Sequence, residues 1–117
     1  LKNRLGSSHP KLTQAVLLME ANIEEPLSTD DIASLVGLSR RQLERLFKQY
    51  LGSLPSRYYL ELRLQRSRQL LLDTHYSIVQ VGLMCGFSSG SHFSTAFGTL
   101  FGNTPREERQ RKLMPPA

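Results

Sequence analysis

The stretch IASLVGLS, residues Ile32 to Ser39, returns in altered form as VGLMCGFS at residues Val81 to Ser88. The two stretches are offset by 49 residues, and each carries a glycine followed by an apolar residue and a serine. Four further residues, Leu43, Phe47, Gly52 and Pro55, recur at an offset of 50 as Phe93, Phe97, Gly102 and Pro105. Because self-similarity at one spacing marks a duplicated unit, the sequence predicts two copies of one supersecondary element.

Each copy has the pattern of two short helices joined by a glycine turn. In the first copy, Ser28 or Thr29 precedes two acidic residues, which predicts the start of a helix from about Asp30 to Val36. Gly37 then suits a left-handed turn. Ser39 caps a helix over 40–51, whose predicted inner residues are Leu43, Leu46, Phe47 and Tyr50. This pattern predicts a helix-turn-helix.

The second copy repeats this arrangement and is followed by one more short helix. Ser77 caps the short helix, Gly86 forms the turn, and the next helix carries Phe93, Ala96, Phe97 and Leu100 on its inner side. Gly102 and Pro105 end that helix and open the last one.

Two further helices complete an all-α fold of about seven helices. The first, over 11–22, turns Leu12, Ala15, Val16 and Met19 inward, and the long helix from Pro55 to Leu72 does the same with Leu60, Leu64, Ser67 and Leu71. The predicted boundaries are a linker from a missing N-terminal domain at 1–9, a first helix-turn-helix subdomain at 10–54, a linking helix at 55–73, a second subdomain at 74–112 and a frayed tail at 113–117.

Composition limits the possible partners. With 117 residues the chain fits one compact domain or two small ones, and its net charge of +5 favours a polyanion such as nucleic acid or an acidic membrane surface. No apolar run is long enough to cross a membrane. The single cysteine, Cys85, excludes an internal disulfide and fits the cytoplasm, and its alignment with Val36 predicts a buried small hydrophobe.

Charge is distributed unevenly along the chain. The segment Ser39 to Leu72 holds eight basic and two acidic residues, whereas Asp73 to Pro105 holds Asp73 as its one formally charged residue. Within the first of these segments, the long helix carries four arginines that we expect to leave most of its outer surface basic: Arg57, Arg63, Arg66 and Arg68. Because phosphate neutralisation dominates affinity for DNA, this distribution predicts that the first unit supplies most of the affinity and base reading.

The ordered motifs resemble those of the AraC/XylS family of bacterial regulators from Pro10 to Arg109. They are Ile32-Ala33 through Gly37-Leu38-Ser39, Leu43 to Lys48 with Gly52 and Pro55, Tyr58, Arg63-Leu64 and Leu70-Leu71, and Gly86-Phe87-Ser88 through Phe93, Phe97, Gly102 and Pro105. The resemblance implies a seven-helix domain that binds a promoter and usually activates transcription. Ser39 to Phe47 and Pro55 to Tyr59 are also similar to the subset with an amidotransferase-like N-terminal domain.

The candidate residues of the first recognition helix are mostly basic: Arg40, Arg41, Gln42, Glu44, Arg45 and Lys48. Arginine and glutamine suit bidentate reading of guanine and adenine, and Glu44 suits cytosine. By matching position, Arg41 and Arg45 resemble the family's main base-reading sites, and we expect Lys48 and Arg57 to contact phosphates. The alternative is a solvated helix face on which Glu44 pairs with Lys48.

The candidates in the second recognition helix are small and polar: Ser89, Ser91, His92, Ser94 and Thr95. The family often carries a longer donor where Thr95 stands, which predicts weaker base reading there. His92 fits a phosphate contact, a base contact or a plain surface position.

Other function classes are less favoured. The match of Gly86 to Gly90 to the G-x-S-x-G motif of hydrolases lacks a preceding strand and a later Asp followed by His. His9, His75 and His92 lack ligand spacing, so we expect no metal, no cofactor and no catalytic residue. A membrane-surface module would use a basic amphipathic helix but would not need a duplicated turn. A protein-docking helical domain remains an alternative on the same scaffold.

The expected partners are double-stranded promoter DNA and RNA polymerase, without a membrane. Because two units in one chain can replace the two subunits of a symmetric repressor, we expect the isolated domain to be a monomer.

Overall fold

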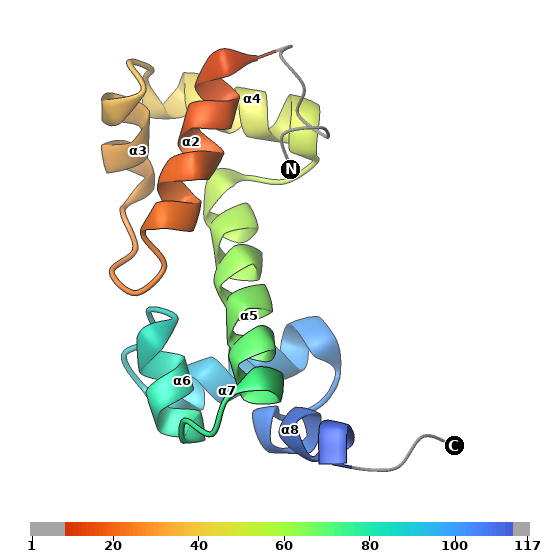
Figure 1. The fold of residues 1–117 in the computed structure, drawn as a ribbon. Helices are drawn as coiled ribbons and strands as arrows, with labels where there is room; N and C mark the ends of the chain where they lie inside the picture. The colour runs from red at the N-terminus through yellow and green to blue at the C-terminus, as the bar shows by residue number, and fades with distance from the viewer. Residues whose placement is uncertain (1–8, 114–117) are drawn as a thin grey trace. The chain divides into compact units, whose positions relative to one another are not determined.

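A computed structural model describes residues 9–113, with side chains up to residue 111. These residues form seven α-helices and no strand, which confirms the all-α prediction (Figure 1). The helices are α2 (Pro10–Ala21), α3 (Thr29–Leu35), α4 (Arg40–Leu51), α5 (Pro55–Asp73), α6 (Ile78–Met84), α7 (Gly90–Phe101) and α8 (Pro105–Leu113). The predicted linker at 1–8 and the predicted tail at 114–117 lie outside the described residues, and Leu113 ends α8.

The described chain divides into two compact units. The first contains residues 9–22 and 26–60, and the second contains residues 23–25 and 61–113. Helix α5 therefore contributes its first six residues to the first unit and the others to the second. The side chains of α5 are thus divided between the two units.

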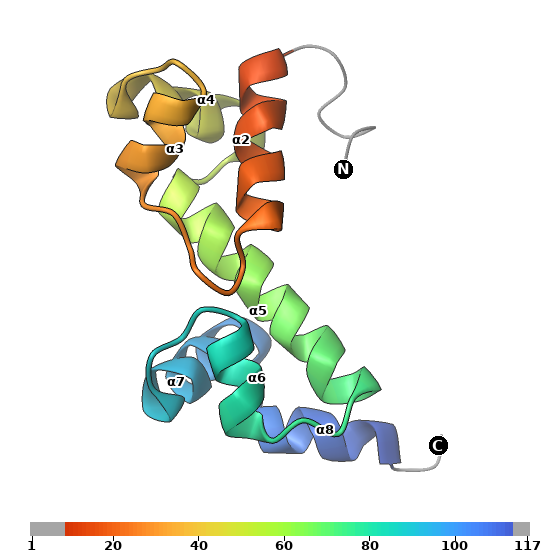
Figure 2. The same cartoon turned by 60° about the vertical axis from the view of Figure 1, so that its left-hand side comes forward.

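The first unit is formed by α2, α3, α4 and the start of α5. Helix α2 lies beside α3 and both contact α4 (Figure 2). All four predicted inner residues of α2 are buried, as are Leu43 and Phe47 of α4. Tyr50, predicted to point inward, is instead 44% exposed, because its ring lies 5.6 Å from that of His9 rather than in the core.

Serine hydroxyls cap the starts of four helices. Ser28, Ser39 and Ser77 each accept a hydrogen bond from the backbone N–H three residues later, as predicted, and Ser89 does the same for α7, which was not predicted from the sequence. The turn glycines Gly37 and Gly86 have φ angles of 76° and 87°. Because L residues with a side chain seldom adopt this conformation, glycine is required in both turns.

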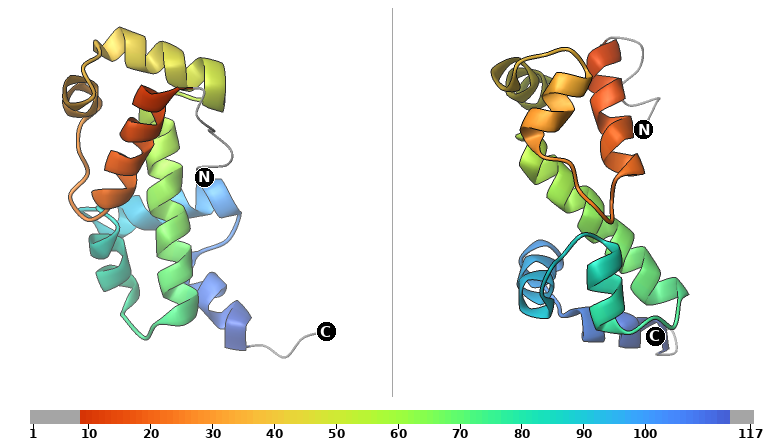
Figure 3. Two further views of the ribbon diagram at one scale, coloured as in Figure 1. Left: turned by 45° about the horizontal axis from the view of Figure 1, so that its top comes forward. Right: turned by 90° about the vertical axis from the view of Figure 1, so that its left-hand side faces the viewer.

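The second unit is formed by the rest of α5 with α6, α7 and α8, and its core is a row of aromatic rings. Helix α6 packs on α7 (teal and light blue in Figure 3). Phe87, Phe93, Phe97 and Phe101 follow one another with ring centroids 5.2, 5.9 and 4.6 Å apart. A Cβ at Gly82 would lie 3.0 Å from the Phe93 ring, so glycine permits the close approach of the two helices. Cys85 is fully buried, as predicted, and burial raises the pKa of its thiol to about 11.

A single tyrosine anchors the loop that follows α2 to α5. The Tyr59 hydroxyl donates to the Asn22 carbonyl and accepts from the Leu27 N–H at 3.1 Å. Tyr59 is 6% exposed, and both bonds are partly buried. These two bonds tie both ends of the loop between α2 and α3 to α5.

Glu108 joins α8 to α5 through a buried carboxylate. It accepts hydrogen bonds from Arg68 at 2.6 Å, from Arg111 at 2.7 Å and from the Asn103 amide at 2.9 Å. These bonds, that from Arg111 first, lower the pKa of Glu108 from 4.5 to about 2. The carboxylate therefore stays ionised in the folded protein at neutral pH.

We expect Glu108→Gln to lower the free energy of unfolding at pH 7 by about 1 to 2 kcal/mol, since both arginines are partly exposed to water. The folded pKa is depressed, so this stabilisation is complete above pH 4.5 and disappears as the pH falls toward 2. Urea titrations of both proteins at pH 7 and pH 3 check this. The exposed Glu20→Gln variant is the control, and a difference that does not shrink at pH 3 would contradict the assigned role.

Candidate nucleic-acid interface

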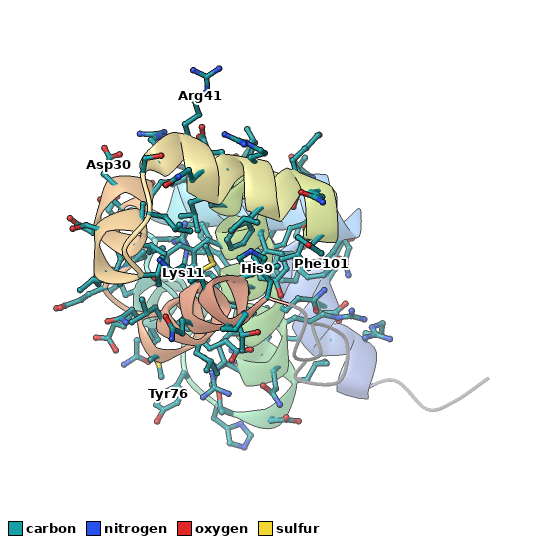
Figure 4. The ribbon with its side chains drawn as sticks, turned by 90° about the horizontal axis from the view of Figure 1, so that it is seen from above. His9, Lys11, Asp30, Arg41, Tyr76 and Phe101 are labelled. Carbon is teal, nitrogen blue, oxygen red and sulfur yellow. The ribbon has the colours of Figure 1, made fainter. Side chains whose placement is uncertain are left out.

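Helix α4 presents a basic face to solvent. Arg41, Arg45 and Lys48 are exposed, and Arg41 projects from α4 away from α2, which carries Lys11 (Figure 4). Arg41 and Arg45 lie four residues apart, so their side chains emerge from one face of the helix. The turn at Gly37 and the cap at Ser39 fix where this face begins.

Arg40 lies between two carboxylates. Its guanidinium is 3.5 Å from Asp30 of α3 and 3.4 Å from Glu44 of its own helix. The Glu44 pair that the sequence suggested, with Lys48, is thus formed with Arg40 instead. Because these pairs are exposed they add little stability, but they hold Arg40 and the half-buried Glu44 in one arrangement.

Gln42 has a structural role at the start of α4. Its Oε1 accepts the Ser39 N–H at 2.9 Å, while the Ser39 hydroxyl accepts the Gln42 N–H at 3.1 Å. This is a capping box. Bidentate reading of adenine needs both the amide oxygen and nitrogen, so it would require Gln42 to leave the cap.

Two arginines of α5 act inside the second unit, which corrects the interpretation of this helix as basic surface. Arg63 donates to the carbonyls of Cys85 and Gly86 at 3.2 and 3.0 Å, and its guanidinium lies 4.6 Å from the centroid of the Phe87 ring. Arg68 binds Glu108.

Counted by unit, charge differs little between the two halves. The first unit, residues 9–22 and 26–60, has six basic and four acidic residues, and the second has seven and six. The imbalance therefore lies between the two predicted recognition helices: α4 holds four basic residues and one acidic residue, whereas α7 has no formally charged residue.

The corresponding face of α7 is exposed and polar. Ser91, His92, Ser94 and Thr95 are all exposed. The Ser89 hydroxyl caps α7 by accepting the His92 N–H at 3.1 Å, and the His92 ring packs edge-on against Phe87 at 5.4 Å. Arg57 of α5 is also exposed, in the first unit. All predicted contact residues except the half-buried Glu44 are thus on the surface.

Sequence reasoning missed the cations that hold the two turns. Lys11 of α2 donates to the Gly37 carbonyl at 3.3 Å, as Arg63 of α5 does to that of Gly86. A basic residue in the helix before each helix-turn-helix was the available signal, but the spacing to the turn differs between the copies. Both contacts hold the backbone of a turn in place.

The structure bears on three alternative interpretations of the sequence. They contain no cluster of three or more histidine, cysteine, aspartate or glutamate side chains suited to a metal ion. None of the helices described is both long and apolar enough to span a bilayer. The G-x-S-x-G match lies in the turn between α6 and α7, so the strand-to-helix elbow that activates a serine is missing at that position.

Two glycine turns, each followed by a capped helix with one buried apolar face and one exposed polar face, define the class of helix-turn-helix domains. A family model described as a helix-turn-helix domain matches residues 32–111. The crystal structure of a transcriptional regulator from Chromobacterium violaceum, one of the AraC-type DNA-binding domain-containing proteins, is 70% identical with a TM-score of 0.88, over 94% of this chain and 98% of that one. The chain belongs to the AraC/XylS family of helix-turn-helix regulators.

Two other comparisons extend this result. The HTH-type transcriptional regulator ArgR of Pseudomonas aeruginosa is 71% identical over 112 residues, 96% of this chain and 34% of that protein. The chain thus spans about a third of the length of the curated relatives it matches. The DNA-binding domain of AdpA, solved in complex with a target DNA, is 25% identical with a TM-score of 0.83, over 88% of this chain and 93% of that one.

Proposed function

We propose that the chain binds double-stranded promoter DNA sequence-specifically, with α4 in the major groove as the main recognition helix. The observation that carries this proposal is the exposed pair Arg41 and Arg45 on one face of a helix that follows a capped glycine turn. An arginine in the major groove binds guanine O6 and N7 with two hydrogen bonds. The structural neighbour AdpA, whose DNA-binding domain was solved in complex with a target DNA, supports this use of the fold.

The remaining residues of the first unit take supporting roles in this proposal. In this proposal Glu44, which pairs with Arg40, accepts a hydrogen bond from cytosine N4 beside Arg45. Lys48 and Arg57 contact phosphates, which sets the register of the protein on DNA without reading sequence. Gln42 serves mainly through the cap that fixes the first turn of α4.

The second unit binds in a second major-groove segment through α7. Ser89, Ser91, Ser94, Thr95 and His92 supply hydroxyls, an imidazole and the backbone N–H groups of the helix start, all of which suit phosphate oxygens. Two successive segments in one chain give an asymmetric site and a monomeric isolated domain.

As part of a longer regulator, the domain would act in the cytoplasm on promoters, with RNA polymerase as the second partner and activation as the expected outcome. The naming of the Chromobacterium violaceum neighbour and of ArgR as transcriptional regulators supports this role.

The test is selection of bound duplexes from random DNA, followed by titration of the selected and scrambled duplexes and of anionic vesicles. We expect specific binding at least about 1,000-fold tighter than binding to scrambled DNA, a footprint over two successive major-groove segments, and a monomer by sedimentation. Equal binding to both duplexes would favour a protein-docking domain, and vesicle binding a membrane module. A strict palindrome would contradict the tandem arrangement.

A further inference from the structure

A small apolar hollow opens at the start of α7. It has a volume of about 40 Å³ and is lined by Val79, Gly82, Leu83, Phe87, Ser88, Ser89 and Gly90. Val79 and Leu83 are 61% and 54% exposed and lie four positions apart, so both side chains are on one face of α6 and open to solvent. The hollow is large enough for a methyl-sized group, since a water molecule needs roughly 10 to 15 Å³.

At the equivalent positions of the repeat, the first unit has charged side chains. At the offsets of the repeat, Val79 corresponds to Asp30 and Gly90 to Arg40. In the first unit these two residues form an ion pair across the start of the recognition helix at 3.5 Å. In the second unit an aliphatic side chain and a glycine replace both charges.

Glycine at position 90 is not required by the fold. A Cβ added there would meet no atom within 4 Å, and its φ lies outside the left-handed region, unlike those of Gly86 and Gly102. A Cβ at this position would project into open space, so a larger residue would be accommodated by the backbone and by its neighbours. Glycine at position 90 thus leaves room for a ligand to approach the hollow from solvent.

We propose that this hollow receives the C5-methyl group of a thymine in the half-site under α7, an inference that rests on the proposed function. The first turn of a recognition helix is the part that lies against base edges. Thymine alone among the four bases presents a methyl group in the major groove. An apolar floor of Phe87 and Leu83 with a rim of serine hydroxyls suits a methyl group beside polar base edges. In this proposal the second unit recognises a base through an apolar hollow, whereas the first unit has charged side chains at the equivalent positions.

The test replaces each thymine of the selected operator, one at a time, by deoxyuridine, which lacks this methyl group and is otherwise the same. We expect one position under α7 to lose about fourfold in affinity, the value of one buried methyl-sized group. In the double variant Val79→Asp with Gly90→Arg, which copies the first unit's pair, the two duplexes should bind equally. The control, Leu35→Ser at an exposed apolar residue of the first unit, should keep the fourfold ratio.

The outcomes separate the two proposals. If selected and scrambled duplexes bind alike, the proposed function fails. If specific binding holds but every deoxyuridine under α7 is neutral, or the double variant keeps the fourfold ratio, the hollow does not bind thymine. The ratio of affinities for the thymine and deoxyuridine duplexes must be measured on folded protein. Circular dichroism melting of each variant therefore checks that its helices are intact.

Discussion

Replacing Arg41 or Arg45 by alanine should weaken binding to the selected operator by about 1 to 3 kcal/mol each, with most of the preference lost at one or two base pairs. Both side chains are exposed on α4, and neither takes part in the Asp30–Arg40–Glu44 arrangement or the capping box. Their removal therefore changes the surface without loosening the helix. Titration against a set of operators mutated at each position measures the change.

Lys48→Ala and Arg57→Ala are the matched controls. Because a phosphate contact carries no sequence information, each should weaken selected and scrambled duplexes alike and reduce the salt slope by about one. If Arg41→Ala and Arg45→Ala behave in this same even way, α4 does not read bases through these two arginines.

Much of the fold follows from features that act over a few residues. The caps at Ser28, Ser39 and Ser77 and the turns at Gly37 and Gly86 depend on local hydrogen bonding and local backbone conformation. They were therefore visible in the sequence. The inner faces of α2 and α7 followed from helical periodicity, because Leu12, Val16, Phe93 and Phe97 recur at its spacing and are buried.

What the sequence concealed depends on partners distant along the chain. Arg68 looked like a surface residue, yet it binds a carboxylate 40 residues away. Arg63 similarly holds a turn 23 residues away. Counting charge along the chain assigned both to a basic linking helix, whereas contacts assign them to the second unit. Periodicity also placed Tyr50 inside, although it lies in the last turn of α4 and packs on His9.

The candidate site was predicted in outline and refined by geometry. Exposure of Arg41, Arg45 and Lys48 follows from the position of the apolar stripe, so the sequence was sufficient for these residues. The sequence was not sufficient for Arg40 and Gln42. The position of the Arg40 side chain depends on Asp30 of another helix, and the Gln42 side chain could either cap α4 or point to solvent. Which residues contact DNA stays a prediction that the variants above test.

The repeat supplies a matched pair of core variants, Phe47→Ala and Phe97→Ala. Both side chains are fully buried and occupy the same position in α4 and α7. Each substitution should lower the free energy of unfolding of its own unit by about 3 to 5 kcal/mol through lost burial and a cavity. Thermal and urea unfolding measure this cost, and the two values should be similar.

DNA binding should distinguish these two variants even though their stabilities do not. Loosening α4 displaces Arg41 and Arg45, whereas loosening α7 displaces hydroxyls, His92 and the apolar hollow. Since charged bidentate contacts contribute more than hydroxyl contacts, Phe47→Ala should reduce affinity for the selected operator at least about tenfold more than Phe97→Ala. Both are titrated at a temperature where circular dichroism shows parental helix content. Equal losses of affinity would mean that α7 contributes as much as α4, and the charge difference between the two helices would then not set their shares of binding.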